Sequence, residues 1–136
     1  MRRGGRRLRH GVLQFSVAAV LGVAALPVLA QAGAQPNLER GRKVYEECVA
    51  CHDLKPGEQE VGPSLKGVLG RTAGTLPGFR FSAAMKRSAI TWDRAVLAKF
   101  LADPQELVRG NRMPYSGIGE PADLSALLDY IEAMGR

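Results

Sequence analysis

The chain has 136 residues, too few for two domains of ordinary size, so we expect one globular domain and a small additional segment. With 46% apolar and 24% charged residues, the composition excludes a wholly disordered chain. The formal net charge is +6, but five of the 19 basic residues are arginines within the first ten positions. The remaining 14 basic residues face 13 acidic ones, a net charge of about +1, which argues against a nucleic-acid-binding domain.

Residues 1–30 have the pattern of a secretory signal peptide. An arginine-rich stretch over 1–10 precedes an apolar run over 12–29, and small residues at the spacing of a cleavage site follow. The expected cleavage positions are after Ala30, Ala32 or Ala34. The pattern predicts export to the periplasm and a mature domain over 36–136. The alternative is an uncleaved membrane anchor, because the apolar run is near the minimum length for crossing a bilayer, but Pro27 and the small residues favour cleavage.

The rest of the chain is expected to be all-α, because several segments have helical spacing and none shows strand-like alternation. In chain order, the predicted helices are one capped by Asn37, a short one over 64–69, one capped by Ser82, one from Thr91 to Pro104 and one that starts at Pro121. The loops between them are long and rich in glycine. Loops of this length rarely pack by themselves, so we expect something other than a protein core to organise them.

The main chemical motif is Cys48-Val49-Ala50-Cys51-His52, a C-x-x-C-H sequence typical of covalent c-type haem attachment. Two thiols at this spacing can each form a thioether with one vinyl group, and His52 then lies below the iron as an axial ligand. A thioredoxin-like redox pair needs an α/β context, and a zinc site needs a second cysteine pair. A structural disulfide is the third alternative, but so small a loop adds little stability.

A low-spin electron carrier also needs a sixth ligand, and three methionines remain after the predicted cleavage. Met134 completes the apolar stripe of the last helix, so we expect it in the core. Met85, beside Lys86 and Arg87, is expected to have a structural role. Met113 lies in a Gly/Pro loop that can present its side chain to a flat cofactor, and the alternative is a loop anchor that packs into the core. A methionine ligand stabilises Fe(II) and raises the reduction potential.

Taken together, these motifs resemble class I cytochrome c, close to the mitochondrial and soluble bacterial short-chain carriers. The resemblance runs from about Gly41 to the end of the chain. It implies an all-α fold of about four to five helices and long loops around one covalently bound haem c. Besides the C-x-x-C-H sequence, the motifs that carry it are Gly62-Pro63-Ser64-Leu65, Gly67, Gly70-Arg71, Gly78-Phe79-Arg80-Phe81-Ser82, Ile90-Thr91-Trp92 and the loop around Met113.

The resemblance implies a role for each residue of the haem site. His52 and Met113 are expected to be the axial ligands of the haem iron. Cys48 and Cys51 are expected to form the thioethers. The Pro63 carbonyl is expected to accept a hydrogen bond from the second ring nitrogen of the histidine, which fixes the tautomer.

Two further residues are expected to contact the cofactor through the same resemblance. Arg71 and Trp92 would donate to a haem propionate. Without the resemblance, Arg71 would be interpreted as a solvated surface charge and Trp92 as a residue of the hydrophobic core. The family pattern also places Gly41 and Tyr130 where the first and last helices cross, because only glycine lets the two backbones approach there.

The sequence departs from the family pattern at several positions. Phe81 and Phe100 stand where many relatives carry tyrosines, and Met85 stands where relatives often carry asparagine, so we expect a less polar haem pocket. Relatives also ring the exposed haem edge with lysines that steer docking. Here that neighbourhood is expected to hold Glu46, Glu47, Gln105 and Glu106, with Lys43, Arg109 and Arg112 as the basic residues.

The sequence thus predicts a periplasmic monohaem c-type cytochrome that carries single electrons and is not an enzyme. Its expected partners are redox proteins: a cytochrome bc complex, a terminal oxidase, a photosynthetic reaction centre or a dehydrogenase. We expect a monomer that binds no nucleic acid and meets membrane complexes transiently. The alternative is a haem peroxidase or a redox-enzyme subunit in which the methionine ligand is displaced.

Overall fold

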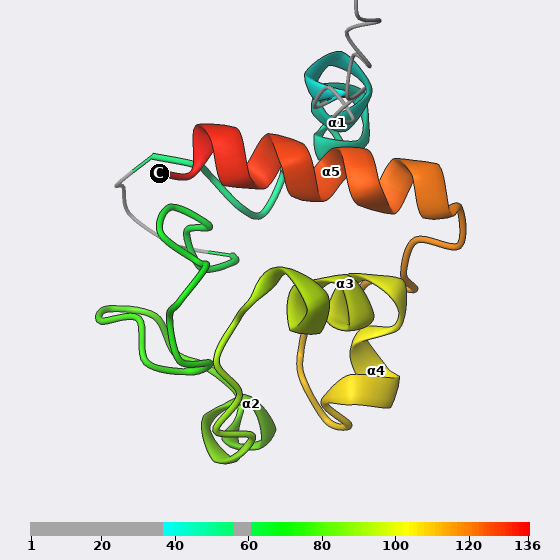
Figure 1. Cartoon of the computed structure of the whole chain (residues 1–136). Helices are drawn as coiled ribbons and strands as arrows, with labels where there is room; N and C mark the ends of the chain where they lie inside the picture. The colour runs from blue at the N-terminus through cyan, green and yellow to red at the C-terminus, as the bar shows by residue number, and fades with distance from the viewer. Residues whose placement is uncertain (1–36, 56–60) are drawn as a thin grey trace, which may run out of the picture. The chain divides into compact units, whose positions relative to one another are not determined.

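The structure of the protein is a computed structural model that describes residues 37–55 and 61–136. The predicted signal peptide and the loop at Pro56-Gly57 lie outside these ranges. Within them the chain forms helices and no strand, so the all-α prediction is confirmed (Figure 1). The helices are α1 (Leu38–Tyr45), α2 (Ala83–Arg87), α3 (Arg94–Ala102), α4 (Pro104–Leu107) and α5 (Pro121–Met134). In the described ranges, none of them has the length and apolar character that crossing a membrane requires.

The first and last helices cross at close range, and Figure 1 shows α1 lying across α5. α1 begins at its expected cap, Asn37, whose side chain accepts a hydrogen bond from the Arg40 amide at 3.1 Å. A Cβ atom on Gly41 would lie 2.1 Å from the Ala126 carbonyl oxygen and 2.7 Å from Tyr130 Cβ. The predicted crossing of Gly41 and Tyr130 is therefore confirmed, and the absence of a side chain on Gly41 is what permits it.

The start of α3 differs from the prediction. Its cap is Asp93, whose carboxylate accepts a hydrogen bond from the Val96 amide at 2.7 Å, and not Thr91. Thr91 instead forms an isolated antiparallel bridge with Thr72. Because this bridge keeps Thr91 extended, the helix begins only after the next available capping side chain.

Two other elements also differ from the prediction. Pro104 follows the end of α3 as expected, but it is also the first residue of α4, which Asp103 caps. Proline suits this position because the first turn of a helix leaves its amides unpaired. The short helix predicted over 64–69 is wrong, since the chain there forms turns, with Gly67 and Gly70 at φ values of 61° and 81°.

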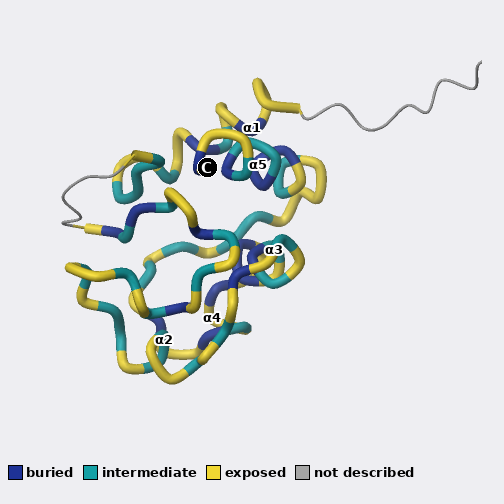
Figure 2. Tube along the Cα trace, turned by 60° about the vertical axis from the view of Figure 1, so that its left-hand side comes forward, coloured by how far each residue is buried: buried dark blue, intermediate teal, exposed yellow. Residues whose placement is uncertain are grey.

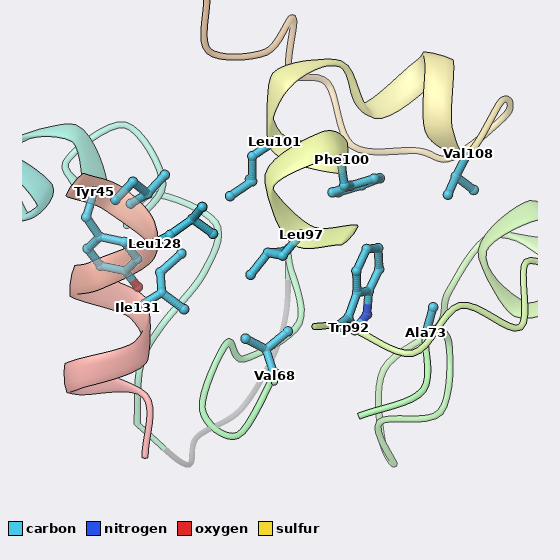
Figure 3. Packing of buried hydrophobic residues seen from close by; sticks show 11 residues of the cluster. Tyr45, Val68, Ala73, Trp92, Leu97, Phe100, Leu101, Val108, Leu128 and Ile131 are labelled. Carbon is cyan, nitrogen blue, oxygen red and sulfur yellow. The ribbon is translucent and has the colours of Figure 1, made fainter. Parts of the chain in front are cut away.

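The hydrophobic core lies between α3, α5 and the loops that lead to them. Figure 2 shows buried positions concentrated along these two helices. In Figure 3, Leu97 and Leu101 of α3 extend toward Leu128 and Ile131 of α5. Met134 was expected to complete this core, but it is 51% exposed, because it is the last residue of α5 and lies beyond the packed stretch.

Candidate haem site

A cavity of about 540 Å³ brings the predicted site residues together. This volume is within the usual range for cofactor pockets, about 300–1,000 Å³. The residues come from separated parts of the chain: the turn after α1, the loops before α2 and α3, and the loop between α4 and α5. All seven line the cavity, namely Cys48, Cys51, His52, Pro63, Arg71, Trp92 and Met113.

The C-x-x-C-H segment directly follows α1. The amides of Cys51 and His52 both donate to the Cys48 carbonyl, at 3.0 and 2.9 Å, so a single turn carries all three side chains to the cavity. Both cysteines are free and half-buried. Burial, with contributions from Glu47 and Cys51, raises the pKa of the Cys48 thiol to about 11, so this thiol is protonated at neutral pH. Two free thiols on one turn are what two thioether bonds require.

His52 is held in a single tautomer. Its Nδ1 lies 2.7 Å from the Pro63 carbonyl oxygen, which can only accept, so the tautomer of the neutral ring has its proton on Nδ1 and its lone pair on Nε2. The Tyr45 hydroxyl donates to the His52 carbonyl at 3.0 Å. A Cβ atom on Gly62 would lie 2.7 Å from Cε1 of the His52 ring, so a glycine is required beside it. The histidine is therefore oriented by its neighbours, with Nε2 available to a metal.

Met113 is half-buried at the cavity, and the side chain of Asn111 organises its loop. Asn111 is only 7% exposed. Its Nδ2 donates to the carbonyls of Pro104 and Val108, at 2.8 and 2.9 Å, and its Oδ1 accepts from the Met113 amide at 2.9 Å. The side-chain amide of Asn111 thus connects Met113 to α4. No role for Asn111 could be predicted from the sequence, because an asparagine in a loop has no pattern that reveals its partners.

Arg71 and Trp92 both bring hydrogen-bond donors to the cavity. The Arg71 guanidinium donates to the carbonyls of Ser64 and Lys66, at 2.8 and 3.1 Å, and pairs with no carboxylate among the described residues. Burial lowers the pKa of Arg71 from its ordinary value. Trp92 is 7% exposed, and its indole N–H has no acceptor within the described part of the chain. A partly buried cation and an unpaired buried donor favour an anionic acceptor such as a haem propionate.

The departures from the family pattern also lie at the cavity, which Phe81, Met85 and Phe100 all line. Phe100 is 6% exposed, and its ring centroid lies 5.1 Å from that of Trp92; Figure 3 shows the two rings against each other. Phe81 makes an edge-on contact with Phe79 at 4.8 Å. Since these rings have no hydroxyl groups, this part of the cavity wall is apolar.

Two side-chain contacts flank Met113 in the sequence. Arg112 donates to the Arg80 carbonyl, and the Tyr115 hydroxyl donates to the Glu47 carboxylate at 3.4 Å. Burial and the charge of Glu47 raise the pKa of Tyr115 to about 12, so its hydroxyl is a donor at neutral pH. Neither contact was predicted from the sequence, because the paired residues are 32 and 68 positions apart and no local pattern connects them.

This set of groups fits a c-type haem. The cavity wall is largely apolar and carries two free thiols, an imidazole with a fixed lone pair, a thioether and donors for carboxylates. A family model described as cytochrome c matches residues 38–135. The chain belongs to the cytochrome c family.

Individual relatives agree with this assignment. Cytochrome c2 iso-2 of Magnetospirillum fulvum is 47% identical over 87 residues, which cover 64% of this chain and 91% of that protein. Cytochrome c2 of Blastochloris viridis is 36% identical over 114 residues, covering 83% of this chain and 86% of the relative. Among solved structures, cytochrome cH from Methylobacterium extorquens matches with a TM-score of 0.67 and 39% identity, covering 71% of this chain and 97% of the other.

Membership confirms the family resemblance and the fold that it implied. As a cytochrome c, the protein binds haem c covalently, with cysteines at the spacing that this attachment needs. It is a monohaem electron carrier and not an enzyme.

Proposed function

We propose that this cytochrome c carries single electrons in the periplasm, with its haem attached through Cys48 and Cys51 and its iron ligated by His52 and Met113. The observation that carries the proposal is that all four side chains line one cavity, although Met113 is far from the other three in sequence. When bound, haem c supplies a one-electron couple between Fe(III) and Fe(II).

Each protein group has a defined task in this arrangement. The hydrogen bond from His52 Nδ1 to the Pro63 carbonyl strengthens the histidine as a ligand. The thioether of Met113 favours Fe(II) and raises the reduction potential. The Trp92 indole N–H, and the guanidinium N–H groups of Arg71 that do not bond the Ser64 and Lys66 carbonyls, would bind the propionates. With His52 and Met113 both bound to the iron, the protein would leave no coordination position open to a substrate, as a carrier requires.

The peroxidase-like alternative receives no support from the site. A peroxidase would need Met113 to leave the iron, a small ligand such as hydrogen peroxide to bind there, and a polar side chain to act on that ligand. The chain has two histidines, and the one besides His52 is His10, within the predicted signal peptide. Arg112, the basic residue beside Met113, donates to the Arg80 carbonyl.

We also propose that residues 1–30 are removed on export and that the haem domain spans 36–136. The partners would be redox proteins such as a cytochrome bc complex, a terminal oxidase, a photosynthetic reaction centre or a dehydrogenase. Mass spectrometry of the periplasmic product tests this part. The expected mass is one haem plus a chain that begins after Ala30, Ala32 or Ala34, and a full-length membrane-bound product would contradict it.

Absorption spectra of the haem-loaded protein test the ligands. Met113→Leu should lose the iron–sulfur charge-transfer band of the oxidised protein while it keeps covalent haem. Met85→Leu is a matched control, because Met85 lines the same cavity, and it should keep the band. Persistence of the band in Met113→Leu would refute methionine ligation at this position.

Covalent attachment has its own test. The double variant Cys48→Ala/Cys51→Ala should lose all haem on acid–acetone extraction, and each single variant should retain at most one thioether. His52→Ala should largely prevent maturation. Haem that stays on the double variant through extraction would overturn the central assignment.

A further inference from the structure

The loop that carries Met113 is held differently on its two sides. On the N-terminal side, Asn111 connects the loop to α4, and Arg112 contacts the Arg80 carbonyl. On the C-terminal side, the next backbone hydrogen bond to the rest of the domain is from the Ile118 amide to the Leu101 carbonyl, at 2.9 Å.

Between Met113 and Ile118, the only hydrogen bond within the described residues is the one from Tyr115 to Glu47. Glu47 directly precedes Cys48, and Tyr115 follows Met113 by two positions. Both side chains line the cavity. This contact therefore connects the attachment segment to the methionine loop at the wall of the cavity.

We propose that Tyr115 and Glu47 are positioning residues that hold the Met113 loop closed over the haem. The proposal rests on the proposed function, since it takes Met113 to be the ligand. When the contact breaks, the stretch after Met113 has no hydrogen bond until Ile118, so the methionine leaves the iron more readily. Global stability depends instead on the packing of α5 against α1 and α3, in which neither Tyr115 nor Glu47 takes part.

The expected effect is modest. At 3.4 Å the contact is longer than a typical O–H···O hydrogen bond, and an ordinary hydrogen bond contributes about 0.5–1.5 kcal/mol. For a bond at the weak end of that range, we expect a change of about two- to five-fold in the equilibrium between the closed and open loop.

Titration of the oxidised, haem-loaded protein with imidazole measures this equilibrium, because imidazole competes with Met113 for the iron. Loss of the iron–sulfur charge-transfer band reports the displacement. Tyr115→Phe and Glu47→Ala should each bind imidazole about two- to five-fold more tightly. The double variant should bind no more tightly than the stronger of the two, since both substitutions break the same contact.

Two variants serve as matched controls. Glu46→Ala removes the neighbouring carboxylate, which pairs with Arg42 at 3.1 Å. Tyr130→Phe removes a hydroxyl at the crossing of α1 and α5. Both should bind imidazole as the wild type does, and all variants should unfold at wild-type urea concentrations.

The outcomes separate this proposal from the one on which it rests. Wild-type affinity in both Tyr115→Phe and Glu47→Ala, or effects that add in the double variant, would overturn the positioning role and leave Met113 ligation intact. A wild-type protein that lacks the charge-transfer band would overturn Met113 ligation and the positioning role together.

Discussion

Replacing Gly41 with alanine tests the close crossing of α1 and α5 on which the domain depends. The new Cβ atom would lie 2.1 Å from the Ala126 carbonyl oxygen, where ordinary contacts begin at 3.4 Å, so the helices must separate by about 1.3 Å. The atom in the way belongs to the backbone and cannot rotate aside. Overpacking of this kind costs about 1–3 kcal/mol, and we expect the upper end. Alanine offsets about 1 kcal/mol through its better helix propensity, which leaves a net loss of about 2 kcal/mol.

Urea unfolding of the haem-loaded protein, followed by circular dichroism, measures this loss. Gly119→Ala is the matched control, because a Cβ atom there meets nothing within 4 Å and its backbone is not left-handed. The control should change the free energy of unfolding by no more than about 0.5 kcal/mol. If Gly41→Ala were as stable as the control, α1 and α5 would not approach each other as closely at Gly41 as the structure shows.

Three further predictions concern the cavity and its surroundings. Asn111→Ala leaves the Met113 backbone amide and the carbonyls of Pro104 and Val108 without their partner. It should lower the free energy of unfolding by about 1–3 kcal/mol and weaken the charge-transfer band. If both the band and the stability were unchanged, Asn111 would not hold the Met113 loop. Phe100→Tyr places a hydroxyl at the cavity wall and should shift the charge-transfer band, the reduction potential or the alkaline loss of Met113. If all three stay unchanged in a folded protein, Phe100 does not lie beside Met113, the proposed ligand. Electron transfer to a physiological partner should depend only moderately on salt, because the net charge outside the first ten residues is about +1; stopped-flow rates that fall by orders of magnitude with ionic strength would reveal a basic docking patch.

The sequence predicts those parts of the site that local motifs encode. The C-x-x-C-H segment needs only a single turn, so its spacing alone indicates where Cys48, Cys51 and His52 lie. The glycine at position 62 and Pro63 also belong to one short motif that meets the His52 ring. In contrast, the partners of Asn111 could not be predicted, because the side chain of an asparagine in a loop has no periodicity or fixed spacing to reveal them.

Helix boundaries also depend on contacts between residues that are distant in the sequence. Ser82 and Asn37 cap their helices as predicted, and among the described residues neither pairs with a distant segment as Thr91 does. Thr91 has the same capping chemistry, but its pairing with Thr72 takes precedence, and Asp93 becomes the cap. Whether Thr91 or Asp93 caps the helix thus depends on a contact with a distant segment, and a single sequence does not reveal that contact.

The His52 side and the Met113 side of the cavity are held by different kinds of contact. His52 is fixed by a backbone carbonyl eleven residues away and by the tight fit of Gly62 against its ring. Met113 depends on side chains, among which Asn111 and Tyr115 contact separate parts of the domain. Local opening in proteins starts where few backbone hydrogen bonds hold a segment. The Met113 side should therefore open well before the domain unfolds, while the His52 side stays in place. If both residues ligate the iron as proposed, the ligand lost first should be Met113.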